Sequence, residues 1–237
     1  MKSIPIFLFF LAIGVASCSI SDSEGSSGVL LRKLITATNS GEYVSTYHYN
    51  GNKLDYIRMD DSEIIDYKYS GDLISEINWT DEEGQINQTT LFFYEADNLV
   101  KIVTQRPWQD FENTIEFTYN ADNTANFTTI GTGWDGGMVE GNPGKYFFDD
   151  QGSIIKVEQY GPTGTTVVNY TYDIQSNPYY NITGMAKVMD YMAGPHNVLT
   201  VSGSSLMTYS YQYNSAGYPT SGSLDNGSGI QSMQYFY

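Results

Sequence analysis

Pairs of aromatic residues two positions apart recur along the chain, each followed by a polar cluster and then by an apolar segment. Residues two apart lie on the same face of an extended strand, and clusters of Asn, Asp and Gly favour tight turns. Each unit therefore predicts a β-hairpin, and the aromatic pairs of neighbouring hairpins would form a ladder across one sheet. The pairs begin at Tyr47, Tyr67, Phe92, Phe117, Tyr146, Tyr170 and Tyr211, and the final MQYFY supplies a further half-unit.

The second strand of each unit has a less regular pattern. In the first unit, Leu54 and Ile57 are three positions apart and cannot share one face of an unbroken strand. Two arrangements remain open at this point: either Leu54 covers the turn, or a β-bulge lies between the two residues.

These units resemble the YD or Rhs-type repeat, YxYDxxGxLxxI, of large bacterial polymorphic toxins. They resemble more closely the short relatives of that repeat in Bacteroidetes cell-surface lipoproteins of unknown function. The fourth unit departs from the pattern, with Asn120 in place of the aspartate and Thr124 in place of an apolar residue. The resemblance implies a meandering antiparallel sheet and no enzymatic activity. It covers residues 42–237 and is carried by the aromatic pairs, the apolar residue after each turn, and the turns Asn50-Gly51, Ser70-Gly71 and Gln151-Gly152.

One segment between the last two full units has a different periodicity. Gly184 to Gly194, GMAKVMDYMAG, places apolar residues at helical spacing between glycines, and Pro195 follows it. We expect a short helix over about 184–194, packed on the concave face of the sheet with Met189 buried. Its methionines could instead form an adaptable binding surface. The surrounding NPYY and HNV sequences resemble an NPF insert and an NNV strand start in the same lipoproteins.

The predicted fold class is thus all-β: a repeat-built antiparallel β-meander, as a curved sheet or open barrel, with that one helix. A single domain is expected over residues 29–237, because about 210 residues follow the tether, a length typical of one all-β domain. The hairpins should pair in sequence order, since their short connections leave no length for crossovers.

The beginning of the chain predicts export and lipidation. A cation at Lys2, an apolar run and small residues precede Cys18, the only cysteine in the sequence. VASC resembles the lipobox of bacterial lipoproteins, which implies a signal peptide over 1–17 and a lipid-modified Cys18. The polar stretch 18–28 would then be a flexible tether, and Asp22 and Glu24 resemble the signals that export Bacteroidetes lipoproteins to the cell surface. The alternative is a secreted protein with an incidental cysteine.

Composition excludes several classes of function. The formal charge of −16 becomes −17 once Lys2 is removed, so nucleic acid should be repelled. Only two histidines are present and no cysteine remains after lipidation, so a Cys/His nucleophile pair and a cysteine zinc site are excluded. We expect no cofactor and no metal. Calcium at the acidic clusters near Asp60, Asp81 and Asp149 is an alternative, although turn chemistry explains such clusters.

The functional prediction is a non-catalytic binding or structural module, anchored in the outer membrane and facing the cell surface. An exposed indole can stack on a sugar ring while neighbouring polar groups bind its hydroxyls. The candidate ligand-binding residues are Trp79, Trp108, Trp134 and Asp135, the last two in the glycine-rich stretch 131–137. The tryptophans could instead pack over sheet edges.

Two other classes of function remain open. A polysaccharide hydrolase would need two carboxylates at a suitable separation. An accessory subunit of a membrane complex would need a broad apolar patch. The carboxylates available to a hydrolase are Glu76, Glu112, Glu140 and Glu158.

Overall fold

The computed structural model describes residues 28–60, 63–133 and 136–237, and in these residues almost all regular structure is β. The first strands are β1 (Lys33–Thr38), β2 (Gly41–Asn50), β3 (Lys53–Met59), β4 (Ile64–Ser70), β5 (Leu73–Thr80), β6 (Ile86–Glu95), β7 (Asn98–Arg106), β8 (Phe111–Tyr119) and β9 (Thr124–Thr132). They are followed by β10 (Met138–Glu140), β11 (Gly144–Phe148), β12 (Ile154–Gly161), β13 (Gly164–Tyr172), β14 (Val198–Ser202), β15 (Leu206–Tyr213), β16 (Pro219–Asp225) and β17 (Ile230–Phe236). Two 3-10 turns, η1 (Pro107–Gln109) and η2 (Met185–Lys187), are the helical elements of the described chain.

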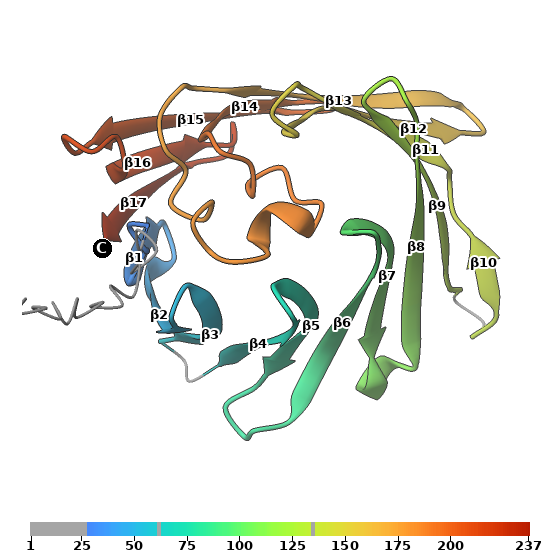
Figure 1. Cartoon of the computed structure of the whole chain (residues 1–237), viewed down its shortest axis with the longest axis horizontal. Helices are drawn as coiled ribbons and strands as arrows, with labels where there is room; N and C mark the ends of the chain where they lie inside the picture. Colours follow the sequence, from blue (N-terminus) through green and yellow to red (C-terminus); the bar gives the residue numbers. More distant parts are fainter. Residues whose placement is uncertain (1–27, 61–62, 134–135) are drawn as a thin grey trace, which may run out of the picture.

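The strands form a closed antiparallel barrel (Figure 1). Successive strands pair in sequence order, as predicted, and β1 pairs with both β2 and β17. Because β10 and β11 both pair with β9, the 17 described strands occupy sixteen positions around the ring. The expectation of an open or merely curved sheet was wrong. β1, which lies outside the aromatic repeat, pairs with the edge strand at each end of the meander and leaves no free edge.

The spacing of Leu54 and Ile57 is explained by a β-bulge. Tyr47 pairs with Ile57, but Tyr49 pairs with Leu54, so Asp55 is an extra residue in β3. Both Leu54 and Ile57 consequently enter the main core. The same slip in register follows the turn in four more hairpins of the repeat, β4–β5, β6–β7, β11–β12 and β15–β16. It also occurs between β13 and β14, which are joined by the longer segment 173–197.

The second aromatic residue of several repeats bonds to the bulged backbone of the preceding hairpin. Its hydroxyl reaches the backbone of the residue directly before the extra residue that interrupts the ladder. Burial raises the pKa of Tyr94 and Tyr172 well above the ordinary value, so these phenols remain protonated donors. The bonds are Tyr94 hydroxyl to Ile74 O (2.9 Å), Tyr172 hydroxyl to Ile154 O (2.6 Å), Tyr237 hydroxyl to Pro219 O (2.8 Å) and Leu54 N–H to Tyr69 hydroxyl (3.0 Å).

The fourth hairpin, β8–β9, is the exception that the sequence signalled. It forms, but without a bulge: Phe117 pairs with Phe127 and Tyr119 with Ala125. The aromatic residue that follows in the next repeat is Phe148, which has no hydroxyl. The β8–β9 ladder is not interrupted, so its backbone needs no hydrogen bond from a tyrosine of the next repeat. The bulge and the tyrosine hydroxyl are therefore both absent at this position.

Tyr94→Phe should therefore destabilise the barrel. The change removes one hydroxyl and leaves Ile74 O, on a residue with 0% exposure, without its partner. We expect a loss of about 1–3 kcal/mol in the free energy of unfolding, measured from urea midpoints at constant m-value. Tyr119→Phe is the matched control, because within the described chain the Tyr119 hydroxyl makes no hydrogen bond. Equal effects of the two substitutions would contradict this role for Tyr94.

The buried apolar and aromatic side chains point into the barrel. The main core contains Tyr47, Leu54, Ile74, Phe92 and Phe117 together with residues of the chain segment inside the ring. That segment, residues 173–197 between β13 and β14, is here called the plug (Figure 1). A 16-position barrel is too wide for its own side chains to fill, so the plug supplies the missing apolar volume.

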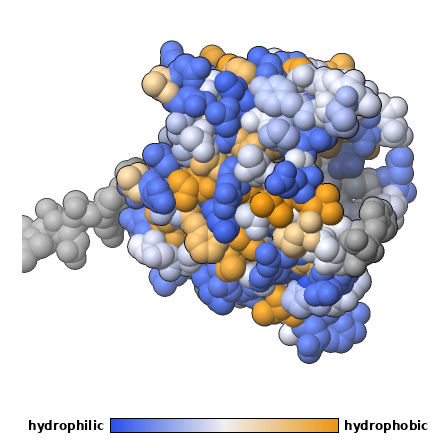
Figure 2. All heavy atoms as spheres, turned by 90° about the vertical axis from the view of Figure 1, so that its right-hand side faces the viewer, coloured by the Kyte–Doolittle hydropathy of each residue, from blue (hydrophilic) through white to orange (hydrophobic). Residues whose placement is uncertain are grey.

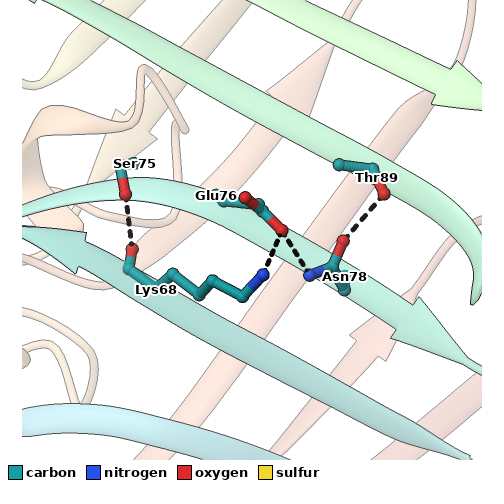
Figure 3. Close-up of polar contacts among 5 residues, drawn as sticks. All are labelled: Lys68, Ser75, Glu76, Asn78 and Thr89. Atoms are coloured by element: carbon teal, nitrogen blue, oxygen red, sulfur yellow. Dashed lines mark hydrogen bonds and ion pairs between the residues drawn. The ribbon is translucent and has the colours of Figure 1, made fainter.

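The outer face carries charged and polar side chains together with exposed apolar ones such as Phe93 and Ile130. Alternate residues of β4, β5 and β6 form a continuous network in which Lys68 Nζ and Asn78 Nδ2 both donate to Glu76 Oε1 at 2.6 Å (Figure 3). Ion pairs on the same face join Lys101 to Glu116 and Lys156 to Glu158. Figure 2 shows one side of the barrel, where hydrophobic residues gather across the middle and hydrophilic residues lie around them.

The predicted helix over 184–194 is reduced to the single turn η2. Gly184 (φ +79°) and Met189 (φ +59°) have left-handed backbones, which end the helical run on both sides. Asp190 Oδ1 then accepts the Met192 N–H at 2.7 Å, a local turn that competes with helix. The segment nevertheless packs inside the sheet, and Met185 and Met189 lie partly buried against the main core.

The plug closes the end of the barrel at which the repeat turns lie. Thr183 N–H donates to Asn52 O at 2.9 Å in the β2–β3 turn. Gly184 lies so close to the β4–β5 turn that a Cβ would come within 2.7 Å of Asp72 O. We call the opposite end, formed by the β3–β4, β5–β6, β7–β8 and other longer connections, the mouth.

No helix within the described residues is both long and apolar enough to traverse a lipid bilayer.

Candidate functional site

Two of the predicted tryptophans come together at the mouth. Trp79 is near the end of β5, and Trp108 lies in η1, 29 residues later in the chain. They belong to neighbouring connections, β5–β6 and β7–β8, and line a single pocket of about 240 Å³. The complete lining is Glu63, Ile64, Trp79, Thr80, Asn87, Gln88, Arg106 and Trp108.

Local sequence fixes the position of Trp108. Pro107 begins the 3-10 turn, and Asp110 ends it in a left-handed conformation with its N–H bonded to Pro107 O. The indole Nε1–H donates to Asn87 O at 3.2 Å on the neighbouring β6 strand. The ring is nevertheless 67% exposed, so its orientation is set by a hydrogen bond while much of its surface stays open to solvent.

Trp79 forms the deeper side of the pocket. It pairs with Ile65 and Gln88 on the adjacent strands and points inward, where it packs partly buried against the main core. The alternative of packing over a sheet edge is wrong for Trp79, since the closed barrel has no such edge. Trp79 thus contributes both to the core and to the pocket lining, so a substitution to alanine would lower stability and alter the pocket at once.

Arg106 and Gln88 provide the polar part of the pocket, and neither was identified from the sequence. Arg106 Nε donates to Gln88 Oε1 at 2.8 Å. The guanidinium also lies over the Phe111 ring, 5.1 Å from its centroid. A cation, an amide and two indoles therefore surround one small cavity, the combination that binds a ring with an apolar face and polar substituents.

The other two predicted ligand-binding residues, Trp134 and Asp135, lie outside the described residues. Pockets do occur beside this stretch: one between β8, β9 and β10 is lined by Phe111, Asn113, Gly131 and Glu140.

A larger pocket, about 520 Å³, lies at the opposite end between the plug and the repeat turns. Its lining includes four aspartates, Asp97, Asp149, Asp150 and Asp190, beside the exposed ring of Tyr119. Within the described chain, no three His, Cys, Asp or Glu side chains are placed to hold a metal ion.

The acidic turns show the predicted turn chemistry. Asp81 Oδ1 accepts the N–H groups of Glu83 and Gln85, and Asp149 Oδ1 accepts those of Gln151 and Ser153. Their carboxylates are therefore used in shaping turns.

The carboxylates suggested for a hydrolase are dispersed over four strands. Glu76 and Glu158 are on the outer face, and hydrogen bonds from Lys68 and Lys156 respectively hold the pKa of each carboxyl below its usual range. A general acid needs a raised pKa, so neither environment suits that role. Glu112 on β8 accepts a hydrogen bond from Gln105 Nε2, and Glu140 is exposed on β10.

Comparison with solved structures supports the fold. The chain is similar to a porin-like protein from Bacteroides uniformis, with a TM-score of 0.51 and 15% sequence identity, covering 87% of this chain and 97% of that one. At this identity the likeness concerns the β-barrel architecture alone. No protein-family model matches the sequence, and no curated protein matches it.

Proposed function

We propose that the protein is a lipid-anchored, non-catalytic glycan-binding module of the outer membrane, with its site in the tryptophan pocket. The observation that carries this proposal is the convergence of Trp79 and Trp108 with Arg106 and Gln88 around one open cavity. Indole faces bind the apolar face of a sugar ring, and the guanidinium and amide groups bind its substituents.

The barrel itself would stand in water. Its outer face carries charged networks such as Lys68–Glu76–Asn78, and a charged side chain facing lipid costs about 2–4 kcal/mol at the bilayer midplane. The plug also fills one end of the lumen, which argues against a conducting channel. Attachment to the membrane would then depend on the lipid at Cys18.

The anchor and the site would lie at opposite ends. The first described residue, Gly28, lies against Asn181 of the plug, and Asn181 Nδ2 donates to Val29 O at 3.0 Å. A tether over 18–28 joins the barrel at this plugged end and spans at most roughly 35 Å. The mouth, with Trp79 and Trp108, would therefore face away from the membrane, where an extracellular polysaccharide is accessible.

Trp108→Ala should weaken polysaccharide binding without lowering thermal stability. The ring is 67% exposed, so its loss removes ligand contact and little core packing. We expect binding to fall about ten- to thirtyfold, as for a Trp at the centre of a binding site. Affinity electrophoresis in gels containing single polysaccharides measures the effect. Phe93→Ala, which removes a 45% exposed ring from β6 elsewhere on the barrel, is the control and should bind normally.

The same experiment separates the alternatives. A hydrolase would release shorter oligosaccharides during the assay, whereas a binding module returns the polysaccharide intact. Failure of every tested polysaccharide to retard the wild-type protein, or a large loss of stability in Trp108→Ala, would reject the glycan site.

A further inference from the structure

We infer that the tryptophan pocket selects sugars that carry a carboxylate, with Arg106 as the anion-binding residue. The inference rests on the proposed glycan function and adds the chemical class of the ligand: a glycan containing uronic acid.

Arg106 is an unpaired cation in a strongly acidic chain. The sequence has 27 acidic residues and 11 lysines and arginines, and four of the ten lysines and arginines in the described chain form ion pairs with carboxylates. No carboxylate of the described chain lies within ion-pair distance of Arg106, even though Glu63 lines the same pocket. An exposed guanidinium left without a partner at a cavity is available for a ligand anion.

The contacts of Arg106 hold the guanidinium without using its two terminal amino groups. Nε donates to Gln88, and the planar group lies over Phe111. The two terminal amino groups make no other hydrogen bond within the described residues, so a forked pair of donors remains free. Such a fork matches the two oxygens of a carboxylate, and its fixed plane reduces the entropy lost on binding.

One sugar residue can meet both parts of the site. In a uronic acid the carboxylate is attached directly to the pyranose ring, so its separation from the apolar ring face is short and fixed. Arg106 and Trp108 are two positions apart in the chain and line the same pocket of about 240 Å³. The indole would take the ring, and the guanidinium would take the carboxylate.

Non-specific attraction cannot supply this selectivity. The formal charge of −16 repels polyanions at long range, and Glu63 adds a negative charge beside the site. A preference for acidic sugars must therefore come from contact with Arg106. Glu63→Gln should accordingly strengthen the binding of an acidic sugar.

Calorimetry of the mature protein with two matched probes tests the inference. The probes are oligosaccharides of galacturonic acid and the same oligosaccharides with methyl-esterified carboxylates, which keep the ring but lose the charge. Wild type should bind the acid at least tenfold more tightly than the ester. Arg106→Gln should abolish this preference by weakening acid binding at least tenfold more than ester binding, and Arg106→Lys should retain only part of it.

Trp108→Ala and Glu63→Gln complete the design. Trp108→Ala should weaken acid and ester by the same factor, whereas Glu63→Gln should improve acid binding several-fold and leave the ester unchanged. Equal affinity of wild type for acid and ester would overturn the inference and leave the glycan site standing. Binding of neither probe, with neutral polysaccharides retarded as before, would have the same meaning. If Arg106→Gln is unstable, the Glu63→Gln comparison still decides the result.

Discussion

Cys18→Ala should move the protein from the membrane fraction to the soluble fraction almost completely. The resemblance of VASC to a lipobox predicts two or three acyl chains at Cys18, and each buried methylene contributes about 0.8 kcal/mol to anchoring. In the proposed arrangement the barrel stands in water, and ion pairs on its outer face such as Lys101–Glu116 would oppose its insertion into lipid. Fractionation of cells expressing each variant, with immunoblotting, measures the change.

Ser19→Ala is the matched control for this substitution. It alters the neighbouring residue but keeps the thiol, so the protein should remain in the membrane fraction. Mass spectrometry of the mature wild type should show an acylated N-terminal cysteine at position 18. An unmodified thiol there, or membrane retention of Cys18→Ala, would contradict the lipid anchor and the orientation built on it.

The local architecture could be predicted because each repeat encodes it within about a dozen residues. Aromatic residues two apart give an inward-facing strand, and an Asn/Asp/Gly cluster gives the turn. The three-residue spacing of Leu54 and Ile57 is incompatible with a regular strand, and a bulge resolves it. The same bulge recurs in four more hairpins and in the β13–β14 pair. Even the weak fourth repeat was informative, since Thr124 marks the hairpin without a bulge.

The local sequence pattern predicts neither the closure of the barrel nor the conformation of the plug. Closure requires β1 to meet β17, and Lys33–Thr38 has no aromatic pair to identify it as part of the same sheet. The helix prediction relied on apolar spacing alone. It missed that the backbone at Met189 is left-handed and that Asp190 forms a turn, both of which are decided by packing inside the ring.

The candidate site could be predicted only in part, because the sequence identifies residue types but not which connections meet in space. Trp79 and Trp108 could be named as candidates from their chemistry, but their convergence depends on the alignment of two neighbouring connections at one end of the barrel. Arg106 and Gln88 were missed because single polar residues in strands give no signal. Only the register, which places Arg106 beside Gln88, reveals their association with the indoles.

Ile74→Ala should cause the largest loss of stability among single core substitutions of this kind, about 2–5 kcal/mol in the free energy of unfolding. Ile74 is 0% exposed, belongs to the main core and contacts the plug at Gly184. The cavity left by the lost atoms cannot collapse, because the closed ring fixes the strand on one side and the plug is bonded to the turns on the other. Urea unfolding monitored by tyrosine and tryptophan fluorescence measures the change.

Ile130→Ala is the control, because Ile130 is 39% exposed and lies on the outer face of β9. Its loss should cost less than about 1 kcal/mol. The comparison also tests which face of the barrel is shielded from water. In a membrane channel the outward isoleucine would contact lipid and the inward one would contact water, so the order of the two effects would reverse. A larger cost for Ile74 therefore supports a barrel that encloses its core and presents its charged face to water.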